Sequence, residues 1–133
     1  MCEGLLHHVE IYVSNLEESE SFWGWFLREL GYQSYQKWGE GQSWKLGETY
    51  LVFVQTENKF LDIPYHRGRT GLNHLAFHAS SRDRVDEMTK MLKERGINIL
   101  YENEHPYAGG ENYYAVYFED PDRIKVEFVA PSP

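Results

Sequence analysis

Two histidines of this 133-residue sequence lie two positions apart in a run that otherwise has the pattern of a buried strand. They are His74 and His78 of the segment GLNHLAFHASS, and in a strand they would share one face. Each nitrogen of a buried imidazole needs a hydrogen-bonding or metal partner. The pair is therefore either a surface or network feature, or it faces a site.

Two other predicted strands carry polar side chains on one face and apolar side chains on the other. These polar residues are His8, Glu10 and Tyr12 in the first strand and Lys125 and Glu127 in the last. Two histidines and a glutamate at such positions could bind a divalent metal and leave positions open for a substrate. Such a set suits Fe(II) and, with less selectivity, Mn, Ni or Zn. The chain lacks the cysteines of a closed structural zinc site.

The elements that would position these residues occur twice along the chain. The same order of elements extends from His8 to Gly31 and again from His74 to Gly96. In each range a strand is followed by a polar helix cap, a helix with an apolar stripe and a glycine that ends the helix. Three strand-like segments follow each helix. We predict an α+β fold of two tandem βαβββ modules that form a curved, partly open mixed sheet around a groove, with the helices outside.

The same pattern predicts how the chain is divided. We expect one domain, 1–133, with a first module at about 5–56, a linker at about 57–70 and a second module at about 71–130. The linker and the segment 102–112 have no regular pattern. They are either lids over a cleft or surface loops.

Composition limits the possible partners. Acidic residues outnumber basic ones 21 to 13, and the net charge of −8 would repel a nucleic acid backbone. No apolar run is long enough to span a membrane and no secretory leader is evident. The only cysteine, Cys2, excludes an internal disulfide and fits a reducing compartment. We expect a cytoplasmic protein with a small-molecule partner, because its 4 Trp, 10 Tyr and 7 Phe would suit the lining of a cleft.

Three segments carry a resemblance to a known family: HHVEIYVSNLEESESFW, GLNHLAFHA and YFEDPDRIKVEFV. Over nearly the whole chain the sequence resembles the vicinal oxygen chelate superfamily, which includes glyoxalase I, bleomycin-resistance proteins, fosfomycin-resistance enzymes, methylmalonyl-CoA epimerase and extradiol dioxygenases. The resemblance implies a divalent metal held by His8, His74 and Glu127. It also implies a possible homodimer.

The sequence departs from the four-ligand members of that superfamily. They take one ligand from the last strand of the first half, and the matching position here is expected to be Phe53, which cannot bind a metal. Gln55 lies two residues further on the same face, so a register slip would bring its amide oxygen into the site. Three ligands are more similar to the extradiol dioxygenases and the fosfomycin-modifying enzymes. Without a fourth, lactoylglutathione lyase activity is less favoured.

Several other residues have two interpretations each. Glu10 and His78 are either proton-transfer groups or solvated side chains at the mouth of the groove. Lys125 holds an anionic substrate group or pairs with a surface carboxylate. Tyr107 and Tyr113 belong either to a substrate lid or to a loop packed on the sheet edge. The predicted substrate-binding residues are Tyr12, Phe53, Gln55, Tyr107, Tyr113 and Lys125.

Two functions follow from these patterns. The first is a metal-dependent enzyme whose ion chelates two neighbouring oxygens of a small substrate, with lyase, isomerase, transferase and dioxygenase chemistry all open. The second is a metal-free protein of the bleomycin-resistance type that sequesters a ligand in its aromatic groove. The three matching ligands favour the enzyme, and Phe53 favours the binding protein.

Overall fold

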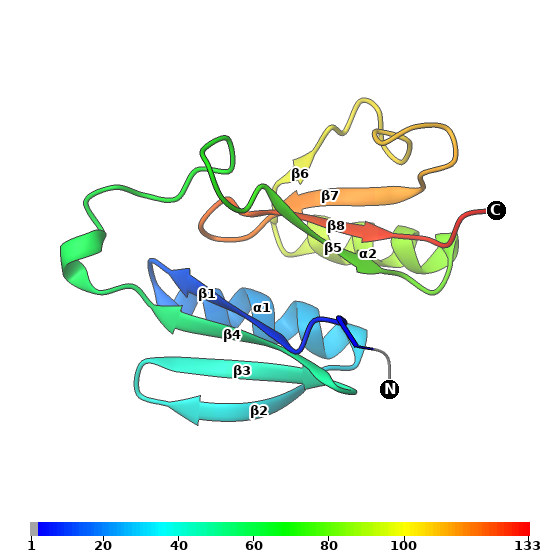
Figure 1. The fold of residues 1–133 in the computed structure, drawn as a ribbon. Coiled ribbons are helices and arrows are strands. Elements are labelled where there is room, and N and C mark those ends of the chain that lie inside the picture. Colours follow the sequence, from blue (N-terminus) through cyan, green and yellow to red (C-terminus); the bar gives the residue numbers. More distant parts are fainter. Residues whose placement is uncertain (1–2) are drawn as a thin grey trace. The chain divides into compact units, whose positions relative to one another are not determined.

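The computed structural model describes residues 3–133, so Cys2 lies outside the described residues. The chain divides into two compact units, residues 1–64 and 65–133, each of which is described by itself. Both units follow the predicted order of strand, helix and three strands (Figure 1). Among residues 3–133, no helix combines the length and apolar character needed to cross a bilayer.

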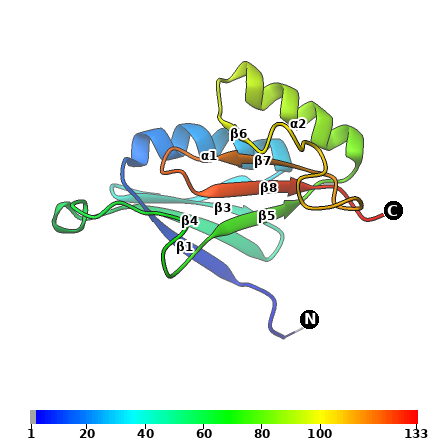
Figure 2. The same cartoon turned by 90° about the horizontal axis from the view of Figure 1, so that it is seen from above.

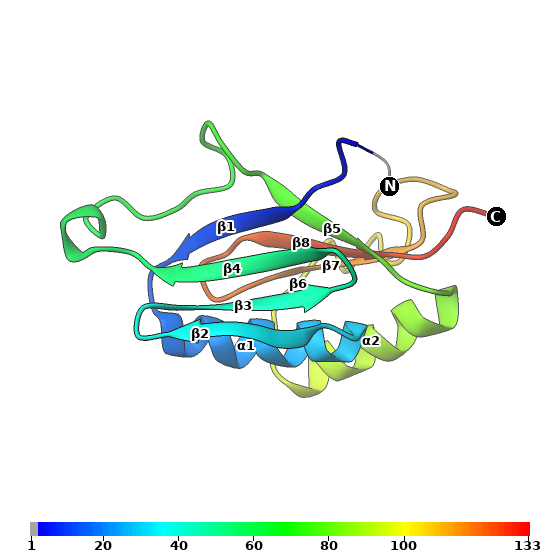
Figure 3. The same cartoon turned by 60° about the horizontal axis from the view of Figure 1, so that its bottom comes forward.

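The first unit contains a four-stranded mixed sheet and one α-helix. Its elements are β1 (His8–Val13), α1 (Leu16–Leu30), β2 (Gln33–Trp38), β3 (Gly41–Leu46), β4 (Thr49–Gln55) and the short 3₁₀ helix η1 (Asn58–Phe60). The strand order is β1-β4-β3-β2, as Figure 3 shows. The β1–β4 pair is parallel and the other two pairs are antiparallel.

The local sequence explains where α1 begins and ends. Asn15 caps its start by accepting a hydrogen bond from the backbone N–H of Glu18 at 3.1 Å. Gly31 ends it in a left-handed conformation with φ of 101°. The helix packs on the sheet through Trp23, which is fully buried and stacks on Phe53 of β4 with 5.0 Å between ring centroids.

The second unit repeats this arrangement. Its elements are β5 (His74–His78), α2 (Arg82–Glu94), β6 (Ile99–Leu100), β7 (Ala115–Glu119) and β8 (Lys125–Val129). The strand order is β5-β8-β7-β6, with β5 and β8 parallel. Helix α2 covers one face of this sheet, over β7 and β8 (Figure 2).

The apolar stripe predicted for the second helix forms the core of this unit. Val85, Met88 and Leu92 of α2 are fully buried, and so are Val116 and Phe118 of β7. Ser81 caps the helix by accepting a hydrogen bond from the N–H of Arg84 at 3.1 Å. The α+β class and the two tandem βαβββ modules are confirmed.

The second unit differs from its predicted elements in one segment. Of the residues 97–102, only Ile99 and Leu100 form a strand, and Tyr101 ends it with a positive φ of 56°. Regular structure resumes at Ala115, so residues 101–114 form a long irregular connection rather than the ends of two strands. This connection includes Tyr107 and Tyr113, which were predicted to contact a substrate.

Candidate functional site

The face of the second sheet that is turned away from α2 brings two of the predicted metal ligands together. His74 is the first residue of β5, and Glu127 is in the middle of the neighbouring strand β8. The Nε2 atom of His74 lies 2.9 Å from Oε2 of Glu127. The Glu127 side chain is only 5% exposed and that of His74 is 38% exposed, so the pair has a buried side and an open side.

A tyrosine completes the surroundings of the buried carboxylate. The Tyr113 hydroxyl donates a hydrogen bond of 2.7 Å to Oε1 of Glu127. Burial and this hydrogen bond to an anion raise the pKa of Tyr113 above its ordinary value. The phenol therefore stays protonated and acts as a donor. Gly109 lies against the Tyr113 ring, where a Cβ atom would overlap it.

The other ring nitrogen of His74 is held by its preceding residue. Oδ1 of Asn73 lies 2.7 Å from Nδ1 of His74. The amide group of Asn73 is itself fixed, because its Nδ2 donates to the backbone carbonyl of Arg67 at 2.9 Å. Arg67 in turn binds the buried carboxylate of Glu119 and donates to the carbonyl of Arg123. This chain of contacts sets the orientation of the imidazole.

The predicted Lys125 lies opposite His74 on β8, and the predicted His78 lies at the far end of β5, opposite Val129. Lys125 lies over the rings of Tyr101 and Tyr117, at 5.1 and 5.4 Å from their centroids, and donates to the Tyr101 hydroxyl at 3.3 Å. His78 lines a hollow of about 310 Å³ together with Tyr113. That volume is at the small end of the range for small-molecule sites, about 300–1,000 Å³.

Tyr107, the other predicted lid residue, is half-exposed and packs edge-on against Tyr114 with 5.5 Å between ring centroids. Tyr114 is anchored by a hydrogen bond from its hydroxyl to Asp86 of α2. Tyr107 is thus supported by the helix side of the unit, whereas Tyr113 contacts Glu127 directly.

The first unit presents its predicted residues from β1. His8, Glu10 and Tyr12 alternate along the exposed face of this strand, as the sequence predicts. The His8 ring stacks on Tyr50 of β4, with 4.6 Å between centroids and 2° between planes. Its Nδ1 lies 2.9 Å from Nδ1 of His7. Tyr50 was not singled out in the sequence because nothing in β4 alone indicates which of its residues pairs with His8.

The orientation expected for Phe53 and Gln55 is wrong. Phe53 is 1% exposed and stacks on Trp23 of α1, so it lies on the helix side of the sheet. The Gln55 amide forms hydrogen bonds at the N-terminus of α1. It accepts from the N–H of Leu16 at 2.9 Å and donates to the carbonyl of Ser14 at 2.8 Å. Neither side chain shares a face with His8.

The strand registers identify the residue that matches Glu127 in the first module. His8 pairs with Tyr50, and Val52 lies two residues further along β4; His74 pairs with Lys125, and Glu127 lies two residues further along β8. Val52 is therefore the counterpart of Glu127. It is 3% exposed and, like Phe53, cannot bind a metal.

Each unit alone supplies fewer than three ligands. Within each, the described residues contain no group of three or more His, Cys, Asp or Glu side chains that could hold an ion. The second unit supplies His74 and Glu127, and the first unit presents His8 separately. Sequence analysis missed Asn73, which contacts the ring of His74 and is itself held by the backbone of Arg67.

Comparison with known proteins places these observations in a family. The chain matches the Glyoxalase/Bleomycin resistance protein/Dioxygenase superfamily over residues 5–128. It is 61% identical over 127 residues to the uncharacterized protein YqjT of Bacillus subtilis (strain 168), which covers 96% of this chain and 99% of that protein. It is 26% identical over 122 residues to the glutathione transferase FosA of Serratia marcescens, covering 92% of this chain and 77% of that protein.

Among solved structures, a candidate glyoxalase from Bacillus halodurans superposes with a TM-score of 0.96. It shares 66% sequence identity with this chain, and the match covers 97% of both chains. The fold described above is therefore also the fold of an experimentally determined relative.

Proposed function

The chain belongs to the glyoxalase/bleomycin resistance protein/dioxygenase superfamily, and from this premise we propose that it is a divalent-metal-dependent enzyme acting on a small molecule. Members of the superfamily typically use divalent metals and bind small-molecule substrates. The proposed substrate binds the metal through neighbouring oxygens. The observation that carries this proposal is the buried carboxylate of Glu127 beside the imidazole of His74.

Burying a carboxylate is costly, and the fold itself does not require one at this position. Val52 occupies the matching position in the first module, where an apolar residue fills the same place in the same topology. In the second module the charge is instead buried and supplied with partners, Tyr113 on one oxygen and His74 on the other. A carboxylate maintained at such a cost indicates a functional rather than a packing role.

The available donor atoms fit a divalent ion. One imidazole nitrogen and one carboxylate oxygen converge within 2.9 Å, and such ligands suit Fe(II), Mn, Ni or Zn. His8, at the matching position in the first strand of the other module, is our candidate for a further ligand. When bound, the ion would polarise the substrate oxygens and stabilise negative charge that develops on them.

The remaining residues have proposed roles around these ligands. Asn73 orients His74, and Tyr113 holds Glu127 in place. His78, which lines the hollow beside Tyr113, and Glu10 of β1 are candidates for moving a proton. Whether the reaction is that of a lyase, isomerase, transferase or dioxygenase depends on the substrate.

A second candidate function is metal-free sequestration of a ligand, as in the bleomycin-resistance branch. The observation in its favour is Val52, which removes the fourth ligand position from the first module. A protein that only sequesters its ligand needs no metal-binding set.

Metal content distinguishes these functions. The full chain, purified without a metal-affinity tag, is analysed by mass spectrometry after incubation with Fe(II), Mn, Ni or Zn. We expect near-stoichiometric binding of one of these ions in the wild type and its loss in His74→Ala. The matched control is His78→Ala, which removes an imidazole from the same face of β5 and should retain the metal. Absence of metal from the wild type with every ion would overturn the enzyme proposal and favour sequestration.

A further inference from the structure

The sheet of the first module carries a row of aromatic side chains across its face opposite α1. The His8 ring stacks on Tyr50, and Tyr50 contacts the ring of Tyr35 with 5.2 Å between centroids. The Lys45 ammonium lies over the Tyr35 ring, 4.5 Å from its centroid. We name these four side chains, on the adjacent strands β1, β4, β3 and β2, the aromatic row.

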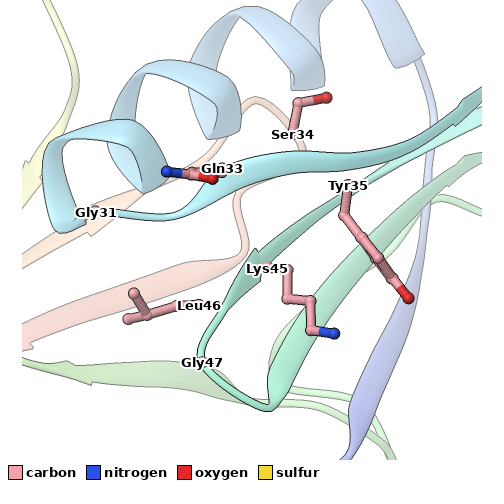
Figure 4. A pocket seen from close by; sticks show the side chains of 7 residues that line it. All are labelled: Gly31, Gln33, Ser34, Tyr35, Lys45, Leu46 and Gly47. Atoms are coloured by element: carbon pink, nitrogen blue, oxygen red, sulfur yellow. The ribbon is translucent and has the colours of Figure 1, made fainter.

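The side of the sheet on which the row lies follows from the neighbouring residues. Trp44, which precedes Lys45 in β3, is 2% exposed and lies against Gly24 of α1. Because successive side chains of a strand alternate, Lys45 points away from the helix. Figure 4 shows Lys45 and Tyr35 projecting side by side from neighbouring strands.

Lys45 differs from a typical surface lysine in what surrounds it. No carboxylate of residues 3–133 forms an ion pair with it, although the chain has a net charge of −8 and 21 acidic residues. Lys59 provides a comparison, because it also lies over a ring, that of Phe60, but it pairs with Glu57 at 3.5 Å. The row therefore contains a cation that is held by a ring and has no anion to neutralise it.

A hollow accompanies this cation. Its volume is about 360 Å³, and its lining includes Lys45, Tyr35, Ser34 and Gln33 (Figure 4). The lining thus offers an ammonium group, a phenol and an amide to a ligand, whereas the Ser34 side chain points to the other side of β2 (Figure 4) and accepts a hydrogen bond from Nε2 of Gln42 at 3.0 Å. Such a volume is large enough for the charged end of a small molecule.

We propose that the aromatic row binds a planar organic anion, whose acidic group contacts Lys45 and whose flat portion lies along Tyr35 and Tyr50 toward His8. This inference rests on the proposed function, because it specifies the substrate class of the site to which His8 would contribute. Lys45 and His8 are two strand spacings apart, or about 10 Å.

The proposal is tested with the full, metal-free chain by two-dimensional ¹H–¹⁵N NMR. The probes are trans-cinnamate and phenylphosphonate, which are small anions with a flat ring, and neutral cinnamamide is the control ligand. We expect saturable shifts at Tyr35, Lys45 and Tyr50 with the anions, and at least tenfold weaker binding of cinnamamide. Lys45→Met should weaken anion binding at least tenfold, whereas the matched Lys59→Met should bind as the wild type does.

Each other outcome opposes the proposal. Equal binding of cinnamate and cinnamamide, unchanged anion binding by a folded Lys45→Met variant, shifts confined to other residues, or no binding of either anion would each overturn it. If Lys45→Met does not fold, Lys45→Arg, which keeps the charge, and Tyr35→Leu, which removes the ring, take its place. Arginine should retain anion binding and leucine should weaken it.

Because these titrations need no metal, they separate the two proposals. Anion binding at Lys45 without metal binding anywhere would leave the aromatic row valid and overturn the enzyme. Metal binding without anion binding would overturn the aromatic-row proposal and leave the enzyme proposal valid.

Discussion

Each module has one glutamate at equivalent paired positions of its sheet, but the glutamate is on the first strand of the first module and on the last strand of the second. In the first module the paired residues are Glu10 of β1 and Val52 of β4, and in the second they are Ala76 of β5 and Glu127 of β8. Glu10 lies on the exposed face of an edge strand, whereas Glu127 is 4% exposed and has two partners. The comparison shows that strand position, not residue type, determines which carboxylate is buried and held in place.

The segments that precede the first strands also differ. Before β1, residues 3–7 are exposed, and His7 contacts His8 through its ring. Before β5, residues 65–73 are tied to the rest of their unit by Arg67, whose guanidinium binds Glu119, and by the Asn73 side chain. The second module thus fixes its histidine through backbone and side-chain contacts, and the first relies on stacking with Tyr50.

The largest expected effect comes from making the second module resemble the first. Glu127→Val removes the buried carboxylate. Tyr113→Phe is combined with it, because the Tyr113 hydroxyl would otherwise lose its hydrogen-bond acceptor. We expect metal affinity to fall by more than about a hundredfold, because ligand loss should exceed the 10–100-fold cost of losing a residue that only supports a ligand. The free energy of unfolding should fall by less than about 1 kcal/mol or rise, since apolar replacement of buried ion pairs is often neutral or stabilising.

Calorimetric metal titration and urea unfolding measure these two quantities on the same variant. Glu10→Gln is the matched control, because it removes the carboxylate of the first module. We expect its metal affinity to stay within about threefold of the wild-type value. A double variant that loses several kcal/mol of stability would show that Glu127 is kept for folding.

The second prediction tests how the segment before β5 is held. Burial raises the pKa of Glu119, but hydrogen bonds from Asn98, Arg67 and Arg123 lower it by more, so the net pKa lies below its ordinary value. Glu119 therefore stabilises the folded chain at neutral pH, and this contribution is lost as the pH falls from about 4.5 through the lower folded-state pKa. Glu119→Gln should cost about 2 kcal/mol at pH 7.

Unfolding by urea at pH 7 and at pH 3 measures this dependence. The difference between wild type and Glu119→Gln should shrink at pH 3, which lies below the ordinary pKa of 4.5, because the carboxylate of the unfolded chain is protonated there. Glu48→Gln, in the exposed turn between β3 and β4, should change stability by less than about 0.5 kcal/mol at either pH. A difference that is equal at the two pH values would contradict the assigned ionisation of Glu119.

Local sequence signals predicted the elements and one face of the site well. The caps at Asn15 and Ser81 and the stop at Gly31 are set by neighbouring residues, so they could be identified from the sequence. Alternation also predicted that His74 and Glu127 share a face with the apolar residues turned the other way. Their role as metal ligands stays a prediction.

The orientation of β4 could not be obtained in this way. Its residues 51–54 are all apolar and buried, so no alternation distinguishes the two faces, and only pairing with β1 reveals that Val52 and not Phe53 matches Glu127. The contacts of Asn73 were equally inaccessible, because they involve the backbone of a segment without periodicity. Pairing between distant segments supplies this information, and a single sequence does not.

The third prediction, with the smallest expected effect, concerns the histidine of the second module. Because Nδ2 of Asn73 donates to a carbonyl, its Oδ1 is the atom that faces His74 and can only accept. Nδ1 of His74 must then carry a proton, which leaves Nε2 as the atom that faces Glu127 and would bind a metal. Asn73→Ala removes this constraint, and we expect metal affinity to fall about tenfold.

Two readouts separate orientation of the ring from loss of folding. Nitrogen-15 NMR of the histidine side chains should show a smaller share of the Nδ1-protonated tautomer of His74 in Asn73→Ala. Asn73→Asp keeps the accepting oxygen and loses only the bond to Arg67, so it should bind metal within about threefold of the wild type. If Asn73→Ala bound metal as tightly as the wild type, the tethered segment before β5 would not be what distinguishes the second module from the first.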